Sequence, residues 1–279
     1  MDNELPMDIF VYWIRERLRI LYRKNKGRKA PWTKDEILAT YRFCNVHRED
    51  DRVTVWIREN WREGEFKDHK DLWFAMVVAR LFNEPATLSA IEPFVLPFRP
   101  MAMRNHLKNL REHQKIFNAA YVVSTNGHAM DKVDYLIDRV LTPLWQDRRF
   151  IRPRTDRDSL ASWAKVLREY DGFAGFMAGQ IVADLKYHAP LIHAHDWKSF
   201  ALSGPGSRRG MNRLLGRPVD QRWKEDDWHE MLMEVQRQLI FEHDLDLHAQ
   251  DIQNCLCEFD KYMRARTGEG SPKQIYNAK

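Results

Sequence analysis

Three polar residues at regular spacing, Asn45, Arg48 and Asp51, form the pattern in this sequence that most suggests chemistry. An apolar stripe at helical spacing leads up to them through residues 37–44, and its continuation places Arg48 and Asp51 where a helix buries core residues. Buried charge is costly unless it is paired and hydrogen-bonded. The pattern therefore indicates either a structural ion pair or a polar active-site floor that also includes Arg52.

A long helix over residues 33–61 is expected to carry these side chains. Thr33 followed by Glu36 matches a capping box, which marks a helix N-terminus. The same periodicity predicts further helices over residues 9–24, 70–82, 102–114, 131–145, 158–170, 173–188, 223–242 and 247–264. Only residues 118–124 have a β-like pattern, and strands do not alternate with helices. The sequence therefore predicts an all-α fold.

The composition is that of a globular protein with no membrane span or cysteine framework. The 279 residues suffice for one large domain or two small ones. We expect a single helical catalytic domain over residues 1–266 and a flexible tail over 267–279. No apolar run reaches eighteen residues, and the N-terminus is acidic, so a cytoplasmic location is expected. The three cysteines include no CxxC pair, and we expect neither a metal nor a cofactor.

The charge is mildly basic and unevenly distributed. The formal net charge is +5, but residues 15–28 and 148–157 are strongly basic. Such runs bind phosphate backbones, although they also occur as solvated helix faces. The two interpretations remain open for both runs.

A second constellation lies at residues 196–216, which read DWKSFALSGPGSRRGMNRLLG. Two short helical pieces around Gly-Pro-Gly are the layout of a helix-hairpin-helix, although an ordinary helical turn has the same pattern. The glycines would allow positive φ in the turn, and the second helix would offer N–H groups to a phosphate. The residues expected to contact DNA are Gly204, Gly206, Ser207, Arg208 and Arg209. No GxxxxGK[ST] loop is present, which disfavours hydrolysis of nucleoside triphosphates.

Two further helices carry polar residues at helical spacing. Gln180, Asp184 and Tyr187 lie on one line of the helix over 173–188. Glu258 and Lys261 flank the apolar stripe of the helix over 247–264. Surface ion pairs and substrate contacts both use such spacing.

Four segments of the chain together resemble one family. They are PWTKDEILATYRFCNVHREDDRVT, FMAGQIVADLKY, LSGPGSRRG and LCEFDKYMR, at residues 31–54, 176–187, 202–210 and 256–264. They resemble the α-glutamyl/putrescinyl-thymine pyrophosphorylases, or amino acid:DNA transferases, whose helical module is also found in 5-hydroxymethyluracil DNA kinases. The resemblance covers residues 9–264 and implies a helix-hairpin-helix DNA-glycosylase-like fold.

The resemblance implies a bacteriophage enzyme of DNA hypermodification that flips a modified thymine out of duplex DNA. An amine or amino acid would replace pyrophosphate on 5-(pyrophosphoryloxymethyl)uracil, with arginines stabilising the departing charge and a carboxylate taking a proton. The expected catalytic residues are Asn45, Arg48, Asp51, Asp184 and Lys261. The expected substrate-binding residues are Arg52, Gln180, Tyr187 and Glu258.

The expected partners are double-stranded DNA and a small amine. The alternative is a glycosylase-like base-excision enzyme, or a module that binds a modified base without reacting with it. Asp220 is the only near match to the catalytic aspartate of glycosylases, and it follows the glycines early. This departure disfavours ordinary cleavage of the glycosidic bond.

Overall fold

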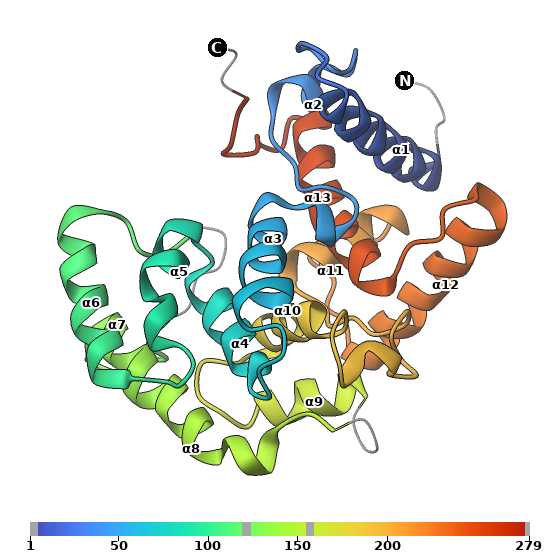
Figure 1. Cartoon of the computed structure of the whole chain (residues 1–279). Coiled ribbons are helices and arrows are strands. Elements are labelled where there is room, and N and C mark those ends of the chain that lie inside the picture. Colours follow the sequence, from blue (N-terminus) through green and yellow to red (C-terminus); the bar gives the residue numbers. More distant parts are fainter. Residues whose placement is uncertain (1–4, 119–123, 155–158, 277–279) are drawn as a thin grey trace. The chain divides into compact units, whose positions relative to one another are not determined.

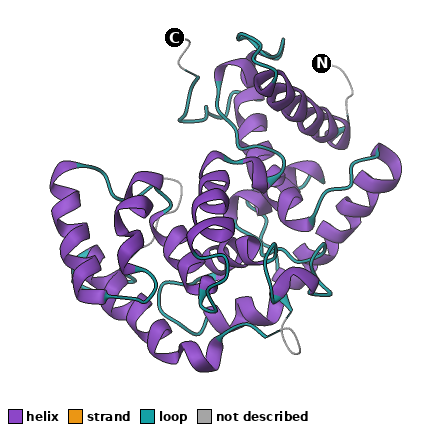
Figure 2. Ribbon diagram, in the orientation of Figure 1, coloured by secondary structure: helices purple, strands orange, loops and turns teal. Residues whose placement is uncertain are grey.

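The computed structural model describes residues 5–118, 124–154 and 159–276. These residues form an almost entirely helical structure, which confirms the predicted all-α class (Figures 1 and 2). Within the described ranges the β-structure is limited to one isolated bridge, between Tyr41 and Ile275. The strand expected over 118–124 falls almost wholly outside the described residues.

Residue contacts divide the chain into two compact units. Unit 1 comprises Met1–Asp51 and Lys198–Lys279, and unit 2 comprises Arg52–Trp197. The sequence predicts a single domain over 1–266, and no composition change marks residue 51 or 197. Each unit is described by itself below.

Unit 1 is built around one long apolar interface between helices. Its helices are α1 (Pro6–Asn25), α2 (Glu36–Thr40), the 3-10 turn η1 (Arg48–Asp50), α11 (Pro205–Leu214), α12 (Glu225–His243) and α13 (Ala249–Arg266). The apolar face of α1 buries Phe10, Trp13 and Ile14, as its periodicity predicts. The rings of Phe10 and Phe259 meet with their centroids 5.0 Å apart, which joins α1 to α13.

Helix α11 lies unusually close to α13 because Gly206 and Gly210 face it. A Cβ at Gly210 would overlap the carbonyl oxygen of Leu256 and lie 2.6 Å from its carbonyl carbon. A Cβ at Gly206 would overlap the sulfur of Cys257. Both glycines lie within α11 and neither has positive φ. Positive φ was expected at the two glycines of Gly-Pro-Gly, and this expectation is wrong: Gly204 is extended with φ −132°, and Gly206 lies within α11 without positive φ.

The helix predicted over residues 33–61 is wrong in its middle. Helix α2 ends at Thr40, and residues 41–47 are irregular, with one bridge residue, coil and a bend, before η1 and the start of α3 (Arg52–Ile57). The N-cap is Asp35 rather than Thr33, since Asp35 Oδ1 accepts the N–H of Leu38 at 2.9 Å. The predicted helix is interrupted because the N–H groups of Cys44, Asn45 and Arg48 donate to side-chain carboxylates rather than to carbonyls four residues earlier.

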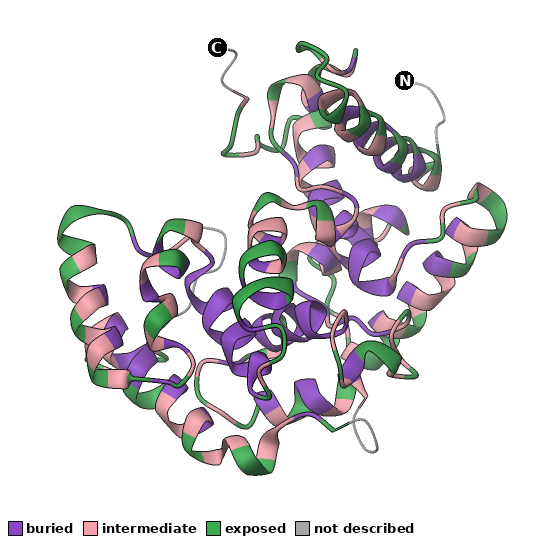
Figure 3. Ribbon diagram, in the orientation of Figure 1, coloured by how far each residue is buried: buried purple, intermediate pink, exposed green. Residues whose placement is uncertain are grey.

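Unit 2 surrounds one fully buried helix. Every residue of α4 (Leu72–Phe82) is buried, and α10 (Gly175–Leu185) packs against it (Figure 3). The other helical elements are α3, the π-helix η2 (Arg58–Glu65), α5 (Pro85–Ile91), η3 (Glu92–Phe94), α6 (Pro100–His113), α7 (Lys132–Tyr135), η4 (Leu136–Leu141), α8 (Thr142–Ile151), α9 (Leu160–Leu167) and η5 (Leu191–His193).

The described part of the C-terminal tail is bonded to unit 1. The N–H of Arg42 donates to Gln274 O, and the N–H of Tyr276 donates to Thr40 O, both at 2.9 Å. The Tyr276 ring also receives the ammonium group of Lys24, 4.2 Å from its centroid. Gln274 and Tyr276 are thus bonded to unit 1, residues 277–279 lie outside the described residues, and the flexibility expected over 267–279 stays a prediction.

Candidate functional site

The polar segment 41–51, which we call the 41–51 loop, is held by carboxylates of α13. Glu258 Oε2 accepts the N–H of Cys44 at 3.1 Å, and Asp251 Oδ1 accepts the N–H of Arg48 at 3.0 Å. These bonds satisfy backbone donors that a helix would have satisfied internally. One face of α13 therefore determines the conformation of the loop.

Asn45 closes the loop on itself. Its N–H donates to Asp51 Oδ1 at 3.0 Å, and its Nδ2 donates to Asp50 O at 2.8 Å. Its Oδ1 accepts from the guanidinium of Arg17 at 3.3 Å. The Asn45 amide, which was expected to be catalytic, is thus engaged through both its oxygen and its nitrogen within unit 1, which is typical of a residue that positions its neighbours.

Arg48 and Asp51 follow on the same loop. Arg48 is buried, with 7% of its surface exposed, and Asp51 is half-buried. The structure therefore brings Asn45, Arg48 and Asp51 together, as the spacing predicts, but on a loop rather than a helix. Arg52 is exposed and begins unit 2.

Glu258 and Lys261 form an ion pair one turn apart on α13, with Nζ 2.5 Å from Oε1. Burial alone would lower the pKa of Lys261, but the Glu258 carboxylate outweighs this effect and the pKa is raised. Lys261 therefore stays protonated at neutral pH and acts as a fixed positive charge. Burial, reinforced by Glu258, raises the pKa of Cys44 and raises that of Cys257 to about 11, which makes both thiols poor nucleophiles.

His47 and Asp251 form a titratable contact between the loop and α13. His47 Nδ1 lies 3.4 Å from Asp251 Oδ2. The hydrogen bond with Asp251 raises the pKa of His47 despite partial burial of the imidazole. Burial opposes ionisation of Asp251, but the bonds from His47 and from the N–H of Arg48 lower its pKa. The contact is strongest when His47 is protonated.

In unit 2, Asp184 is buried in a bidentate ion pair with Arg80. Arg80 Nε and one terminal nitrogen reach the two carboxylate oxygens at 2.5 and 2.6 Å. Asn83 and Thr54 accept the other Arg80 donors at 2.9 Å, and Arg62 donates to Asp184 O at 3.2 Å. Asp184 has no exposed surface. A carboxylate held in this way is suited to organising arginines.

Tyr187 lies just beyond the C-terminus of α10, near the cationic groups of Arg62 and Lys186 and the indole of Trp197. The Arg62 guanidinium lies 5.0 Å from its ring centroid, and the Trp197 ring meets it edge-on at 5.5 Å. Lys186 is buried, and its Nζ donates to Trp197 O at 3.2 Å. Gln180 is buried on α10. Gln180 and Asp184 thus lie on α10, whereas Tyr187 lies beyond its last residue, Leu185. Arg62, Arg80 and Lys186, which contact Asp184 or Tyr187, were not predicted from the sequence.

The expected helix-hairpin-helix forms only its second helix. Residues 195–204 are turns and coil, and α11 begins at Pro205 after the N-cap Gly204. Ser207 is fully buried, and its Oγ accepts the N–H of Gly204 at 2.9 Å and donates to Gly204 O. Ser207 therefore caps the helix. The first helical piece predicted within 196–216 is absent because the residues before Gly204 bond to α12 and α13 instead.

The two arginines expected to bind phosphate both have carboxylate partners in unit 1. Arg208 contacts Glu225 at 2.8 Å, and Arg209 contacts Asp260 at 3.0 Å. Burial opposes ionisation of Glu225, but bonds from Ser203 and Arg208 lower its pKa. Each arginine side chain is still more than a third exposed. A phosphate could share these guanidinium groups, in competition with the carboxylates.

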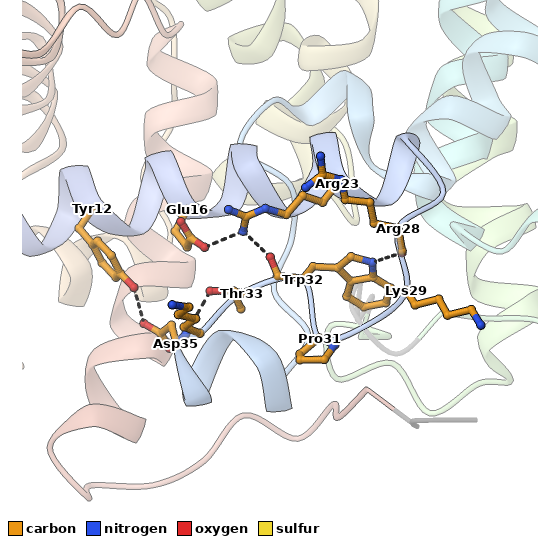
Figure 4. Close-up of a pocket in the computed structure, with 10 residues that line it drawn as sticks. Tyr12, Glu16, Arg23, Arg28, Lys29, Pro31, Trp32, Thr33 and Asp35 are labelled. Carbon is orange, nitrogen blue, oxygen red and sulfur yellow. Dashed lines mark hydrogen bonds and ion pairs between the residues drawn. The ribbon is translucent and has the colours of Figure 1, made fainter.

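A cavity with a charged lining lies in each unit. The unit 1 cavity, of about 490 Å³, lies between α1 and the segment before α2. Figure 4 shows Arg23 reaching both Glu16 and the carbonyl of Trp32, and the Tyr12 hydroxyl donating to Asp35. The unit 2 cavity, of about 660 Å³, includes Arg152 and Arg154 from the basic run over 148–157. Neither cavity includes a predicted site residue.

The described residues include neither a metal-binding cluster nor a membrane-spanning helix. No group of three or more His, Cys, Asp and Glu side chains in this part of the chain is arranged to hold a metal ion. In the same residues, no helix has the length and apolarity to cross a membrane.

Comparison with known proteins gives one family and one relative. A family model described as "5-hmdU DNA kinase, helical domain" matches residues 5–271. The 5-hmdU DNA kinase of Bacillus phage SP10 is 34% identical over an alignment of 231 residues, and the match covers 75% of this chain and 36% of the phage protein. The match thus spans little more than a third of that relative's length. No solved structure matches the chain.

Proposed function

The chain belongs to the 5-hmdU DNA kinase helical-domain family, and from this premise we propose that it is a DNA-modifying enzyme acting on bases derived from 5-hydroxymethyluracil. The observation that carries the proposal is the extent of the match, because residues 5–271 include every described helix of both units. The sequence has no GxxxxGK[ST] loop. The proposed chemistry is therefore on the modified base rather than phosphoryl transfer from a nucleoside triphosphate.

The proposed reaction is substitution at the exocyclic methylene of 5-(pyrophosphoryloxymethyl)uracil in DNA. The nitrogen of a neutral amine forms a C–N bond while the C–O bond to pyrophosphate breaks, and pyrophosphate leaves with the electron pair. The proton lost from nitrogen passes to a carboxylate. Negative charge grows on the leaving group, and arginines in a dry site stabilise such charge.

The buried and half-buried groups of the 41–51 loop suit these roles. Arg48 would hold the pyrophosphate, because its guanidinium is already withdrawn from bulk water. Asp51 is the proposed base, since it is half-buried, whereas both oxygens of Asp184 accept from Arg80. Lys261 would contribute fixed positive charge. Asp184 would position Arg80 and Arg62 rather than exchange protons.

A second candidate function is recognition of the modified base without chemistry. The observation that favours it is the engagement of two expected site carboxylates, since Asp184 is paired with Arg80 and Glu258 with Lys261. In a helical domain that only binds DNA, such ion pairs would serve only to stabilise the fold.

The test is incubation of the chain with duplex DNA that carries the pyrophosphorylated base, together with glutamate, glycine or putrescine. The DNA is digested and its nucleosides are analysed by mass. A new nucleoside containing the amine supports the transferase, and a released free base supports the glycosylase-like alternative. DNA binding without any product supports recognition alone. Absence of both binding and product would refute the proposed action on DNA.

Arg48→Lys tests the leaving-group role, with Arg168→Lys as the matched control. Arg168 is exposed on the surface of unit 2. If Arg48 grips pyrophosphate, its replacement by lysine loses the planar fork and slows transfer about a hundred- to a thousandfold without a matching change in the melting temperature. A parallel loss of stability and activity would instead assign Arg48 a structural role.

A further inference from the structure

The cavity of unit 2 combines a cationic rim with an apolar floor. It is lined by residues 67–70, 72–73, 152–154, 185 and 188–191, and its volume is about 660 Å³. From this combination we infer that the cavity binds a nucleoside phosphate unit, with the phosphate on the rim and the base and sugar on the floor. The inference rests on the proposed function for one point, the choice of DNA as the source of that unit.

The rim is dominated by positive charge. Lys67, Lys70, Arg152 and Arg154 line the cavity, and Asp68 is the carboxylate among its lining residues. Lys67 and Lys70 are exposed, and in the described structure neither ammonium group makes a hydrogen bond or an ion pair. Ammonium groups without a carboxylate partner are the groups that phosphate oxygens bind most readily.

Arg152 is held in place by the buried carboxylate of Asp71. Its Nε and one terminal nitrogen donate to Asp71 Oδ1 at 3.1 and 2.6 Å, and Asp71 is 1% exposed. His69 is oriented by the same residue, because its Nδ1 accepts the N–H of Asp71 at 3.0 Å. A neutral His69 therefore carries its proton on Nε2, as a donor. Asp71 thus organises two side chains of the cavity wall.

The floor is apolar and rigid. Leu72, Trp73, Leu185 and Leu191 are buried and line the cavity. The Trp73 ring meets the Trp163 ring edge-on, with their centroids 5.6 Å apart. Among the described residues, the indole N–H of Trp73 has no acceptor. An apolar surface with a few convergent polar groups is typical of small-molecule sites, and bases stack on such surfaces.

Phe150 favours DNA over a free nucleotide as the source of the unit. It lies in the last turn of α8 with 86% of its surface exposed, two residues before Arg152. Apolar side chains beside basic residues are used to wedge open base steps in duplex DNA. The basic run over 148–154 thus places a wedge and two cavity-lining arginines on one segment.

The experiment compares Lys67→Ala/Lys70→Ala with Lys165→Ala/Arg168→Ala, which removes the same charge from exposed positions on and beside α9 of the same unit. Binding of the full chain to a fluorescent duplex bearing 5-hydroxymethyluracil is measured over a range of salt concentrations. The cavity variant should bind at least about tenfold more weakly, and its salt slope should fall by about 1.8, since each phosphate contact contributes about 0.9. The control variant and the melting temperatures of both should stay close to the parent.

A second arm uses thymidine monophosphate in place of DNA. Weaker binding of this nucleotide to the cavity variant, with unchanged duplex affinity, supports the site and assigns it a free nucleotide. Weaker duplex binding, accompanied by a similar loss in Phe150→Ala, supports the site and assigns it DNA. Equal behaviour of the cavity and control variants toward both probes overturns the inference. Amine transfer by the parent is measured in parallel, so that a failed cavity and a failed proposed function give different results.

Discussion

Gly210→Ala should disrupt unit 1 severely, because α11 has no room for a side chain there. The added Cβ would overlap Leu256 O and lie 2.6 Å from the Leu256 carbonyl carbon. Carbon atoms in contact are normally about 3.5–4.0 Å apart, so α11 would have to retreat by about 1 Å. The obstacle is the backbone of α13, which cannot rotate away as a side chain can.

The expected loss of folding stability lies at the upper end of the range measured for overpacked cores. Overpacked cores lose about 1–3 kcal/mol, occasionally more, and separation of two helices also weakens the van der Waals contacts along their interface. We expect a loss of about 3 kcal/mol or more, which corresponds to a melting temperature lower by about 6–12 °C for a chain of this size.

Two further glycines calibrate the measurement in thermal melts. A Cβ at Gly206 meets the side chain of Cys257, which can move, so Gly206→Ala should destabilise less. A Cβ at Gly175 meets nothing within 4 Å, so Gly175→Ala should be neutral or slightly stabilising. The order of stability should be Gly175→Ala, then Gly206→Ala, then Gly210→Ala. A Gly210→Ala protein that melts within about 2 °C of the parent would refute the packing argument.

Three other outcomes are expected from the contacts described above. The pKa of His47 is raised in the folded protein, so its contact with Asp251 stabilises the fold fully below the unfolded pKa of 6.5. This stabilisation weakens as the pH rises through the folded-state pKa of His47. The difference in melting temperature between the parent and His47→Gln should therefore shrink from pH 6 to pH 8.5. Asp184→Asn leaves a buried guanidinium without its carboxylate and should cost about 3–5 kcal/mol in a urea melt; a cost below about 1 kcal/mol would contradict this assignment. Arg208→Ala/Arg209→Ala should weaken binding to all DNA sequences alike and lower the salt slope by up to about 1.8, and an unchanged slope would remove α11 from the DNA interface.

The regular helices could be predicted because their signal is local. Periodicity placed helices over 9–24 and 247–264, and the structure has Pro6–Asn25 and Ala249–Arg266 there. The same signal was misleading over 41–51, where Cys44 and Arg48 bond to carboxylates of α13 more than 200 residues away in sequence. A local pattern carries no information about such partners.

The candidate site shows the same limit. The spacing of Asn45, Arg48 and Asp51 predicted burial on a helix, whereas Arg48 is buried and Asn45 and Asp51 are half-buried on the 41–51 loop. The partnership of Arg80 with Asp184 joins residues 104 positions apart, and Arg80 lies in a stretch that otherwise looks like plain core. The glycines of α11 could be recognised as special, but whether they served a turn or a helix contact depended on where α13 lies.

The division of the chain has a consequence for synthesis on the ribosome. Unit 1 is made from two separated stretches, and all of unit 2, residues 52–197, is translated between them. At about 5–20 residues per second, the first 51 residues wait about 7–30 seconds for Lys198 to appear. During that time the apolar face of α1, with Phe10 and Trp13, has neither α11 nor α13 to cover it. Unit 2 can meanwhile fold around its own core. The nascent chain then carries a folded unit 2 and an uncovered α1, whose solubility at that stage depends on chaperones or on the basic residues over 15–28.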